Sequence, residues 1–285
     1  MNCWSTVVQG SLARAATQAL NGFFIMDEAL FSAHTANTQR AAVEGERLLP
    51  DGSRLVWALS RREFGPMSFR GHPEWDVAHN RMQFLRIHGS TLDQTVSPLL
   101  EHTSNVRVVT REDRRKGARE AETAFHPVDG LVTRAADVTL LTTHADCLPI
   151  WMVSPYSGWI GLAHAGWRGI IAGIVSNLVE AVPTGERNGL TLGIGPGISS
   201  GAYEVGAEVA DRFRTDDLVA DAVAERDGRY YVDLADAARR QGEAAGADVD
   251  LSMFKCTYET PYLSSYRRDR EAFHPMAAII TRVSG

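Results

Sequence analysis

Residues 138–169 read VTLLTTHADCLPIWMVSPYSGWIGLAHAGWRG and contain three short apolar runs. The runs at 138–143, 148–153 and 159–163 each have the length of a buried β-strand. A polar insert, His144 to Cys147, separates the first two runs. After the third run, His164 opens a turn in which two glycines flank Trp167 and Arg168, and an amphipathic stretch follows. The region therefore predicts a set of buried strands with polar side chains at their ends.

Further elements are expected on both sides of this region. Apolar residues from Ile170 to Val182 recur at 3.6-residue spacing, which predicts one continuous helix from about residue 169. Asp233 is expected to cap a helix that extends to about residue 245. Other strands are expected at residues 54–59, 104–109, 190–194, 230–232, 253–258 and 276–283, and other helices at 77–87 and 203–213. Because strands and helices mix without strict alternation, we predict an α+β fold, a single domain with mixed β-sheets flanked by helices.

The composition is that of an ordinary globular protein. The chain has 285 residues, a formal net charge of -6, 44% hydrophobic residues and 22% charged residues. The acidic balance argues against a chain-wide nucleic-acid surface, although a local arginine cluster can still bind a small anion. No run of about 18 apolar residues occurs, so no membrane span is expected. The charge run REDRRKGAREAE at 111–122 carries both signs, which is typical of a solvated loop or an exposed helix.

Two further features concern compartment and organisation. The cysteines Cys3, Cys147 and Cys256 are too few for a disulfide framework, which favours a reducing compartment and a cytoplasmic protein. Residues 1–50 are rich in Ala, Thr, Gln and Asn, and the helical spacing of apolar residues between positions 12 and 23 predicts a helix there. We therefore predict an N-terminal extension at 1–50 and a catalytic domain at 51–285.

The candidate site begins with Cys147 and His164, which stand at strand ends. Cys147 follows Asp146, and a carboxylate between two buried segments needs a partner, which favours a functional site. The alternative for Cys147 is a small core residue, the more common role of an isolated buried cysteine. Functional side chains often project from such rigid termini. The third member is either His88, which precedes a glycine, or His102, which precedes a strand. The strand would fix the position of the His102 side chain more closely. Two histidines and one cysteine match a catalytic zinc site, where three protein ligands leave the fourth position to water or substrate.

Several segments resemble one known family. They are VDGLVT (128–133), ADCLP (145–149), HAGWRG (164–169), IGP (194–196), YEVG (203–206), Cys256-Thr257 and SYRRD (265–269). In these segments the chain resembles the YfiH/laccase-domain family, also called multicopper polyphenol oxidase-like. The resemblance runs in the family's order from about residue 54 to the C-terminus. It implies a YfiH-like fold and a metal-dependent enzyme.

The resemblance implies the identity of the metal ligands. Two of the family's ligands fall on Cys147 and His164. An Asn-Arg pair precedes the family's remaining histidine by about 22 residues, and Asn80-Arg81 stands at that interval before His102. The resemblance therefore implies a metal site of His102, Cys147 and His164, with zinc as the expected metal and copper as the alternative.

The resemblance also implies purine nucleoside chemistry. The expected reactions are phosphorolysis of adenosine, inosine or methylthioadenosine, and deamination of adenosine. Arg62, or Arg61 in the neighbouring register, falls at the family's active-site arginine. Asp146 either orients the ligands and accepts a proton, as a catalytic group beside Cys147 and His164, or only bonds backbone amides at its strand end.

Binding of the nucleoside and of phosphate requires an anion pocket. We expect the substrate-binding residues to be Arg168, Gly195, Tyr266 and Arg267. Arg268 and the amides of residues 195–197 are further candidates for phosphate binding. No nucleic acid or membrane partner is expected, and the oligomeric state stays open.

Two other functions are kept as alternatives. The first is hydrolytic, with Cys147 as a thiolate nucleophile and His164 as base; the resemblance implies, for this chemistry, an amidase that edits peptidoglycan precursors. Copper-dependent polyphenol oxidation comes last, because blue-copper and trinuclear sites need more histidine ligands than these motifs offer.

Overall fold

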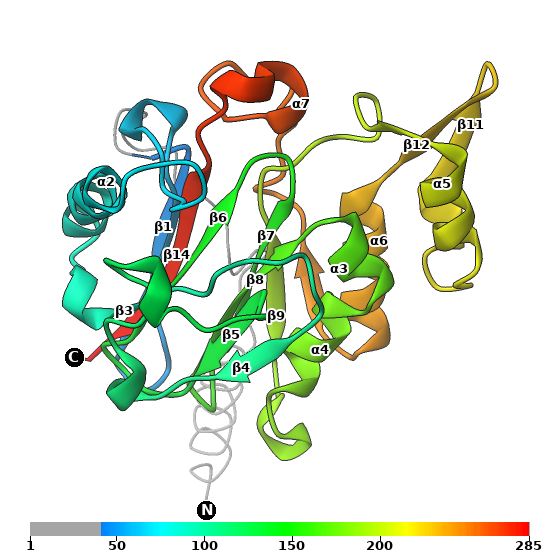
Figure 1. Ribbon diagram of the computed structural model, residues 1–285. Coiled ribbons are helices and arrows are strands. Elements are labelled where there is room, and N and C mark those ends of the chain that lie inside the picture. Colours follow the sequence, from blue (N-terminus) through cyan, green and yellow to red (C-terminus); the bar gives the residue numbers. More distant parts are fainter. Residues whose placement is uncertain (1–40, 285) are drawn as a thin grey trace, which may run out of the picture. The chain divides into compact units, whose positions relative to one another are not determined.

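Two β-sheets pack face to face between helices in the computed structural model, which describes residues 41–284 (Figure 1). The first sheet has the order β1 (Val43–Leu48), β2 (Arg54–Leu59), β14 (Met276–Val283), β6 (Thr139–His144) and β3 (Thr95–Val96). The second has the order β13 (Asp248–Asp250), β9 (Thr191–Ile194), β7 (Leu148–Ser154), β8 (Trp159–Ala165), β5 (Gly130–Thr133) and β4 (Val106–Val108). Both sheets combine parallel and antiparallel pairs, so the predicted α+β fold with mixed sheets is confirmed.

Helices cover the outer faces of the two sheets. On the first sheet, α2 (Glu74–Ile87) buries Phe84 and Leu85 against apolar side chains that include Leu141 and Ile279. On the second, the cover consists of α3 (Trp167–Ile171), α4 (Ile174–Glu180) and α6 (Leu234–Ala244). A small antiparallel sheet of β10 (Glu204–Val205), β12 (Arg229–Val232) and β11 (Val223–Arg226) carries α5 (Ala207–Arg214), and α7 (Tyr266–Asp269) precedes β14. The layers are thus helix, sheet, sheet and helix.

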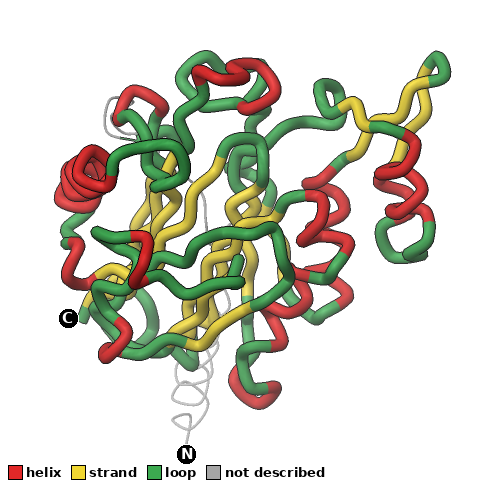
Figure 2. Tube along the Cα trace, in the orientation of Figure 1, coloured by secondary structure: helices red, strands yellow, loops and turns green. Residues whose placement is uncertain are grey.

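The antiparallel pair of β7 and β8 stands at the centre of the second sheet. Leu148 pairs with Ala165, so the start of β7 lies beside the end of β8. The connection from β6 into β7 and the turn after β8 therefore emerge at one end of the sheets (Figure 2). Alternate side chains of β7 pack under the helices, while Trp151 faces the first sheet and donates its indole N–H to the Ile279 carbonyl at 2.9 Å.

Three predicted elements differ from the structure. The helix expected from 169 to 182 is broken into α3 and α4, because Gly173 adopts a left-handed conformation with φ 85° that interrupts the helix. The helix expected from residue 203 begins only at Ala207, after β10. The strand expected at 253–258 is wrong: the structure shows turns there and, within the described residues, one isolated bridge between Gly197 and Cys256. Asp233 caps α6 as expected, accepting the Asp236 amide proton at 3.0 Å.

The first strand lies inside the predicted N-terminal extension. β1 pairs with β2 along its whole length, from Val43 opposite Leu59 to Leu48 opposite Arg54. A boundary at residue 50 would divide this hairpin, so the end of the predicted extension belongs to the first sheet. The helix expected between positions 12 and 23 lies outside the described residues.

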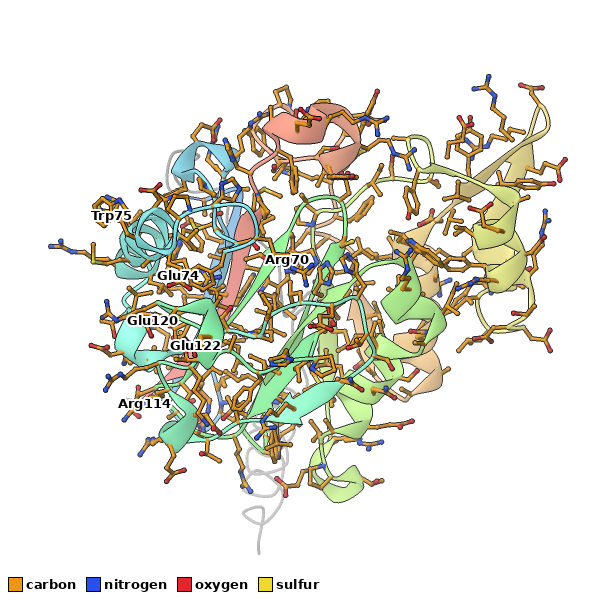
Figure 3. All side chains as sticks on the ribbon, in the orientation of Figure 1. Arg70, Glu74, Trp75, Arg114, Glu120 and Glu122 are labelled. Carbon is orange, nitrogen blue, oxygen red and sulfur yellow. The ribbon has the colours of Figure 1, made fainter. Side chains whose placement is uncertain are left out.

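The surface agrees with two further expectations. Arg114, Glu120 and Glu122 of the charge run at 111–122 are exposed (Figure 3), so this run is solvated as predicted. None of the described helices has the length and apolar character needed to span a membrane.

The Trp151 hydrogen bond predicts a large loss of stability in Trp151→Phe. Phenylalanine removes the donor to Ile279 and leaves a gap between two close-packed sheets, which should cost about 3 kcal/mol of unfolding free energy. Urea unfolding followed by circular dichroism measures this loss. Trp75→Phe is the matched control, because Trp75 is 71% exposed on α2 and projects outward (Figure 3). Equal stability losses in the two variants would contradict this account of the inter-sheet packing.

Candidate metal centre and active site

His102, Cys147 and His164 meet at the end of the sheets described above. One imidazole nitrogen of each histidine and the Cys147 sulfur all lie within 4.8 Å of one another. No other such group of three or more His, Cys, Asp or Glu side chains occurs between residues 41 and 284. His88 lies elsewhere, with its ring 4.8 Å from that of Phe84 and a nitrogen 3.8 Å from a Glu44 oxygen. The structure therefore brings His102, and not His88, beside Cys147 and His164.

Backbone geometry directs these side chains toward one point. Cys147 directly precedes β7 and His164 stands near the end of β8, so the hairpin register places them side by side. His102 and Asp146 have positive φ angles of 60° and 78°, a left-handed conformation that is costly for residues with a side chain. A Cβ atom at Gly166 would lie 2.8 Å from the Cys147 sulfur and 3.1 Å from Cδ2 of His102. The glycine after β8 thus leaves room for the two neighbouring ligands.

One residue that the sequence analysis did not select, Asp129, connects the histidines. Its carboxylate is fully buried. It accepts hydrogen bonds from the backbone amides of Glu101, His102 and Thr103 at 3.1, 3.0 and 2.7 Å, and from the Thr103 hydroxyl at 2.9 Å. It also lies 3.0 Å from Nδ1 of His164, and its backbone carbonyl accepts the His164 amide proton at 2.8 Å. With Nδ1–H donating to the carboxylate, Nε2 of His164 is left to face a ligand.

The sequence held a signal for Asp129. It lies in the segment VDGLVT, immediately before a buried strand, where an ionised carboxylate requires partners. Those partners come from residues 101–103 and 164, which are distant in sequence. Local patterns could therefore mark Asp129 as unusual but could not identify the groups that it binds.

Charge interactions and hydrogen bonds shift the pKa values of three groups at the site. Burial would raise the pKa of the Cys147 thiol, but the positive charge of His164 and hydrogen bonds from His102 and His164 lower it to about 6. Burial would lower the pKa of His164, but the Cys147 thiolate and the Asp129 carboxylate raise it to about 9. Burial would raise the pKa of Asp129, but the hydrogen bond and positive charge of His164 and the hydrogen bonds from Thr103 lower it to about 2. Cys147 is thus readily available as a thiolate, the form that binds metals.

A third histidine, His144, supports the site without belonging to the ligand group. His144 is buried, which lowers its pKa and keeps the ring neutral. Its Nε2 lies 2.8 Å from the Thr142 hydroxyl, and its Nδ1 lies 3.2 Å from the Cys147 carbonyl. His144 therefore fixes the backbone of the Cys147 turn.

Comparison with known proteins places the chain in a family. Residues 67–283 match the model of the multi-copper polyphenol oxidoreductase laccase family. The chain belongs to this family.

Relatives and solved structures of the laccase family agree with this assignment. A Geobacillus stearothermophilus protein named purine nucleoside phosphorylase YlmD is 35% identical over 221 residues, which are 74% of this chain and 81% of the relative. A protein named adenosine deaminase RL5, from an unknown prokaryotic organism, is 33% identical over 55% of this chain and 62% of its own length. The crystal structure of YlmD from G. stearothermophilus has a TM-score of 0.73 at 32% identity, covering 81% and 92% of the two chains. That of a hypothetical protein YfiH from Bacillus licheniformis has a TM-score of 0.75 at 25% identity, covering 84% and 99%.

In this laccase-family chain, Asp146 is held by segments far away in sequence. One carboxylate oxygen accepts the Thr257 hydroxyl proton at 2.6 Å, and the other accepts the Arg267 amide proton at 2.7 Å. These bonds favour the alternative in which Asp146 binds backbone and hydroxyl donors at its strand end. Asp129, rather than Asp146, is the carboxylate that contacts a predicted metal ligand.

The predicted active-site arginine takes part in an ion pair. Arg62 lies 3.3 Å from Asp269 of α7, while Arg61 pairs with Glu63 at 3.2 Å and stacks on the Tyr262 ring at 4.7 Å. Arg268 donates to the carbonyls of four residues and to Asp269. The Arg268 guanidinium thus holds the loop before α7 in place, and phosphate binding by Arg268 stays a prediction.

The backbone amides of Gly195 and Gly197 are hydrogen-bonded within the protein. The Gly195 amide donates to the Pro149 carbonyl at 3.0 Å and the Gly197 amide to the Lys255 carbonyl at 3.1 Å, and proline between them has no N–H group. Both amide donors are therefore occupied within the protein, and substrate binding at Gly195 stays a prediction. A Cβ atom at Gly195 would lie 2.3 Å from the Trp151 ring, so glycine is needed there for close packing.

The other predicted substrate-binding residues lie nearer the surface. Tyr266 is 55% exposed and packs on the Phe273 ring at 5.1 Å. Arg168 is exposed in the first turn of α3 and stacks on Trp167 at 4.2 Å. Arg267 is partly buried and lies over the Tyr203 ring at 5.3 Å. Arg168 and Arg267 therefore keep cationic groups beside the region that contains Cys147.

The Asp129 network predicts a pH-dependent stability loss in Asp129→Asn. Because the folded pKa of Asp129 is about 2, below the ordinary value of 3.8, its stabilising contribution is present above about pH 4 and is lost as the pH falls through about 2. We expect the metal-free variant to lose about 3 kcal/mol of unfolding free energy at neutral pH. Urea unfolding at neutral pH and near pH 3 should show this deficit shrinking in acid.

The control for this experiment is Asp227→Asn, at an exposed turn position where asparagine tolerates the positive φ of 50°. It should change stability little at either pH. A deficit in Asp129→Asn that is as large in acid as at neutral pH would contradict the role of the carboxylate charge.

The space beside Gly166 predicts weak metal binding in Gly166→Ala. The added methyl group would push against Cys147 and His102, so the zinc dissociation constant should rise roughly tenfold or more. Competition with a chromophoric chelator measures this constant. Gly185→Ala is the control, since nothing lies within 4 Å of a Cβ atom there. Equal zinc affinity in the two glycine variants would show that Gly166 does not shape the site.

Proposed function

We propose that this laccase-family protein is a zinc-dependent purine nucleoside phosphorylase acting on adenosine, inosine and methylthioadenosine, with adenosine deaminase activity. The observation that carries the proposal is the group of His102, Cys147 and His164, whose ligand atoms lie within 4.8 Å of one another. Relatives named purine nucleoside phosphorylase and adenosine deaminase support the substrate class. The family match at residues 67–283 supports a catalytic domain within residues 51–285.

The residues present fit a zinc ion. Two imidazole nitrogens and a thiolate are typical ligands of catalytic zinc, and copper is the alternative metal for the same donors. When bound, the ion supplies a Lewis acid that polarises oxygen groups and activates water. Asp129 holds the His164 ring and the His102 backbone, so the His164 imidazole and the loop that carries His102 are positioned before a ligand arrives.

Positive side chains near this centre suit the phosphate co-substrate. Arg168 and Arg267 offer planar guanidinium groups, which bind phosphate oxygens in pairs. The nucleoside and phosphate are the proposed partners, without a nucleic-acid partner. We further propose a cytoplasmic location, because Cys147 and Cys256 are both free thiols and a reducing compartment preserves a thiolate ligand.

A second candidate function has its own supporting observation. Cys147, His164 and Asp129 form a nucleophile, a base and an orienting carboxylate, as in cysteine hydrolases. This arrangement would suit an amidase acting on peptidoglycan precursors. Copper-dependent polyphenol oxidation ranks last: the family description names several coppers, whereas residues 41–284 contain one three-ligand group.

Incubation of the zinc-loaded protein with adenosine, with and without phosphate, tests the proposal. We expect adenine release that depends on phosphate and slower formation of inosine, each followed by chromatography. Formation of neither product would contradict the purine function. Cys147→Ser should lose stoichiometric zinc, measured by metal analysis, and at least roughly 100-fold of its phosphorolysis because a zinc ligand is removed.

Cys256→Ser is the matched control, because Cys256 lies outside the ligand group and contacts the Ser199 hydroxyl at 3.1 Å. It should keep both zinc and activity. If the chelated, zinc-free protein instead cleaved amide substrates through Cys147, the amidase function would replace the phosphorylase function.

A further inference from the structure

Tyr203 occupies a fixed position next to the metal centre and is not among its ligands. Its amide donates to the Ser199 carbonyl at 2.9 Å, and its carbonyl accepts the Val232 amide proton at 3.2 Å. The backbone of Tyr203 is therefore held from both sides, just before β10. The side chain is partly buried, so its ring has a restricted set of orientations.

Arg267 connects Tyr203 to the Cys147 turn. Its guanidinium lies 5.3 Å from the Tyr203 ring centroid and donates to the Glu204 carbonyl at 2.9 Å. Its backbone amide donates to Asp146 at 2.7 Å, and Asp146 directly precedes Cys147. The start of α7 thus places one guanidinium group on the tyrosine ring, and the backbone of the same residue binds the Cys147 turn.

Arg168 approaches the same phenol from α3. This helix begins one residue after Gly166, where an added Cβ atom would lie 2.8 Å from the Cys147 sulfur. The Tyr203 hydroxyl lies in the field of Cys147 and Asp146, which are negative, and of Arg267 and Arg168, which are positive. Burial and the Cys147 charge raise the pKa of Tyr203, so the hydroxyl is a proton donor at neutral pH. Within residues 41–284 this hydroxyl has no hydrogen-bond partner.

We propose that the Tyr203 hydroxyl, together with the guanidinium groups of Arg267 and Arg168, forms the binding site for the phosphate co-substrate. This inference rests on the proposed phosphorylase function and deepens it. Two cations and a neutral donor match the charge and the several acceptor oxygens of phosphate. The exposed position of Arg168 lets it reach a phosphate entering from solvent, while Tyr203 and Arg267 fix the inner side of the site.

The position of this site fits the chemistry of phosphorolysis. A phosphate oxygen bonds to C1′ of the ribose while the C1′–N9 bond breaks. The purine takes the bonding electron pair and leaves with the proton that hydrogen phosphate gives up. Phosphate bound between Tyr203 and the metal centre would stand next to a nucleoside held at that centre. In this role Tyr203 orients the attacking group.

Kinetics of the zinc-loaded full-length protein test the proposal. In Tyr203→Phe the KM for phosphate should rise roughly tenfold or more, as expected for loss of a hydrogen bond to a charged group. The KM for the nucleoside should change less, and phosphorolysis should fall more than deamination. Tyr156→Phe is the matched control, because Tyr156 is 53% exposed in the turn at the opposite end of β7 from Cys147.

Direct binding separates this inference from the proposed function. Inorganic phosphate is titrated into both tyrosine variants and the wild type, and binding is followed by Trp fluorescence, since Trp167 lies against Arg168. Weaker binding to Tyr203→Phe alone supports the phosphate site, even if no purine is released and the phosphorylase function fails. Equal binding by all three proteins, no binding by the wild type, or a raised KM for the nucleoside alone would overturn it.

Discussion

Asp129 is a fully buried carboxylate that receives five hydrogen bonds, and the arrangement of the metal centre depends on it. Burial of a charge is costly unless the charge is fully paired. Here the pairing groups are three successive amides and a hydroxyl at one side of the site, and an imidazole at the other. One carboxylate therefore shapes the loop that carries His102 and orients the ring of His164. This coupling explains how residues 27 and 35 positions away from Asp129 meet at one point.

The two packed sheets provide the rigid frame for this network. Trp151 connects the sheets by a buried hydrogen bond, and the register of β7 with β8 places Cys147 next to His164. Two residues where the frame ends, His102 and Asp146, adopt left-handed backbone conformations. Such conformations persist only when surrounding bonds hold them. Asp129 supplies those bonds for His102, while Thr257 and Arg267 supply them for Asp146.

Cys147 and His164 suit two chemistries, and a bound metal decides between them. The pKa of Cys147 is lowered by His164, so the thiolate is available both as a ligand and as a nucleophile. A metal ion held by Cys147 and both histidines would occupy the thiolate and leave the centre open to substrate. Without the metal, Cys147, His164 and Asp129 have the order of a hydrolytic triad. Metal occupancy is thus the property on which the phosphorylase and amidase functions differ.

Local patterns were enough to predict the buried strands around residues 138–165 and the mixed-sheet fold, because apolar periodicity needs no knowledge of distant contacts. The same patterns marked Cys147 and His164 only as polar residues at strand ends, and the family motifs implied their role as ligands. Motif resemblance added His102, which the structure brings beside them. Tertiary structure alone decided the partners of Asp129, the division of the helix at Gly173 and the engagement of Arg268 and the Gly195 amide. Each of these depends on contacts between residues far apart in the chain. No local pattern records such contacts, because hydrogen-bond partners and packing distances are set only when the sheets and loops come together.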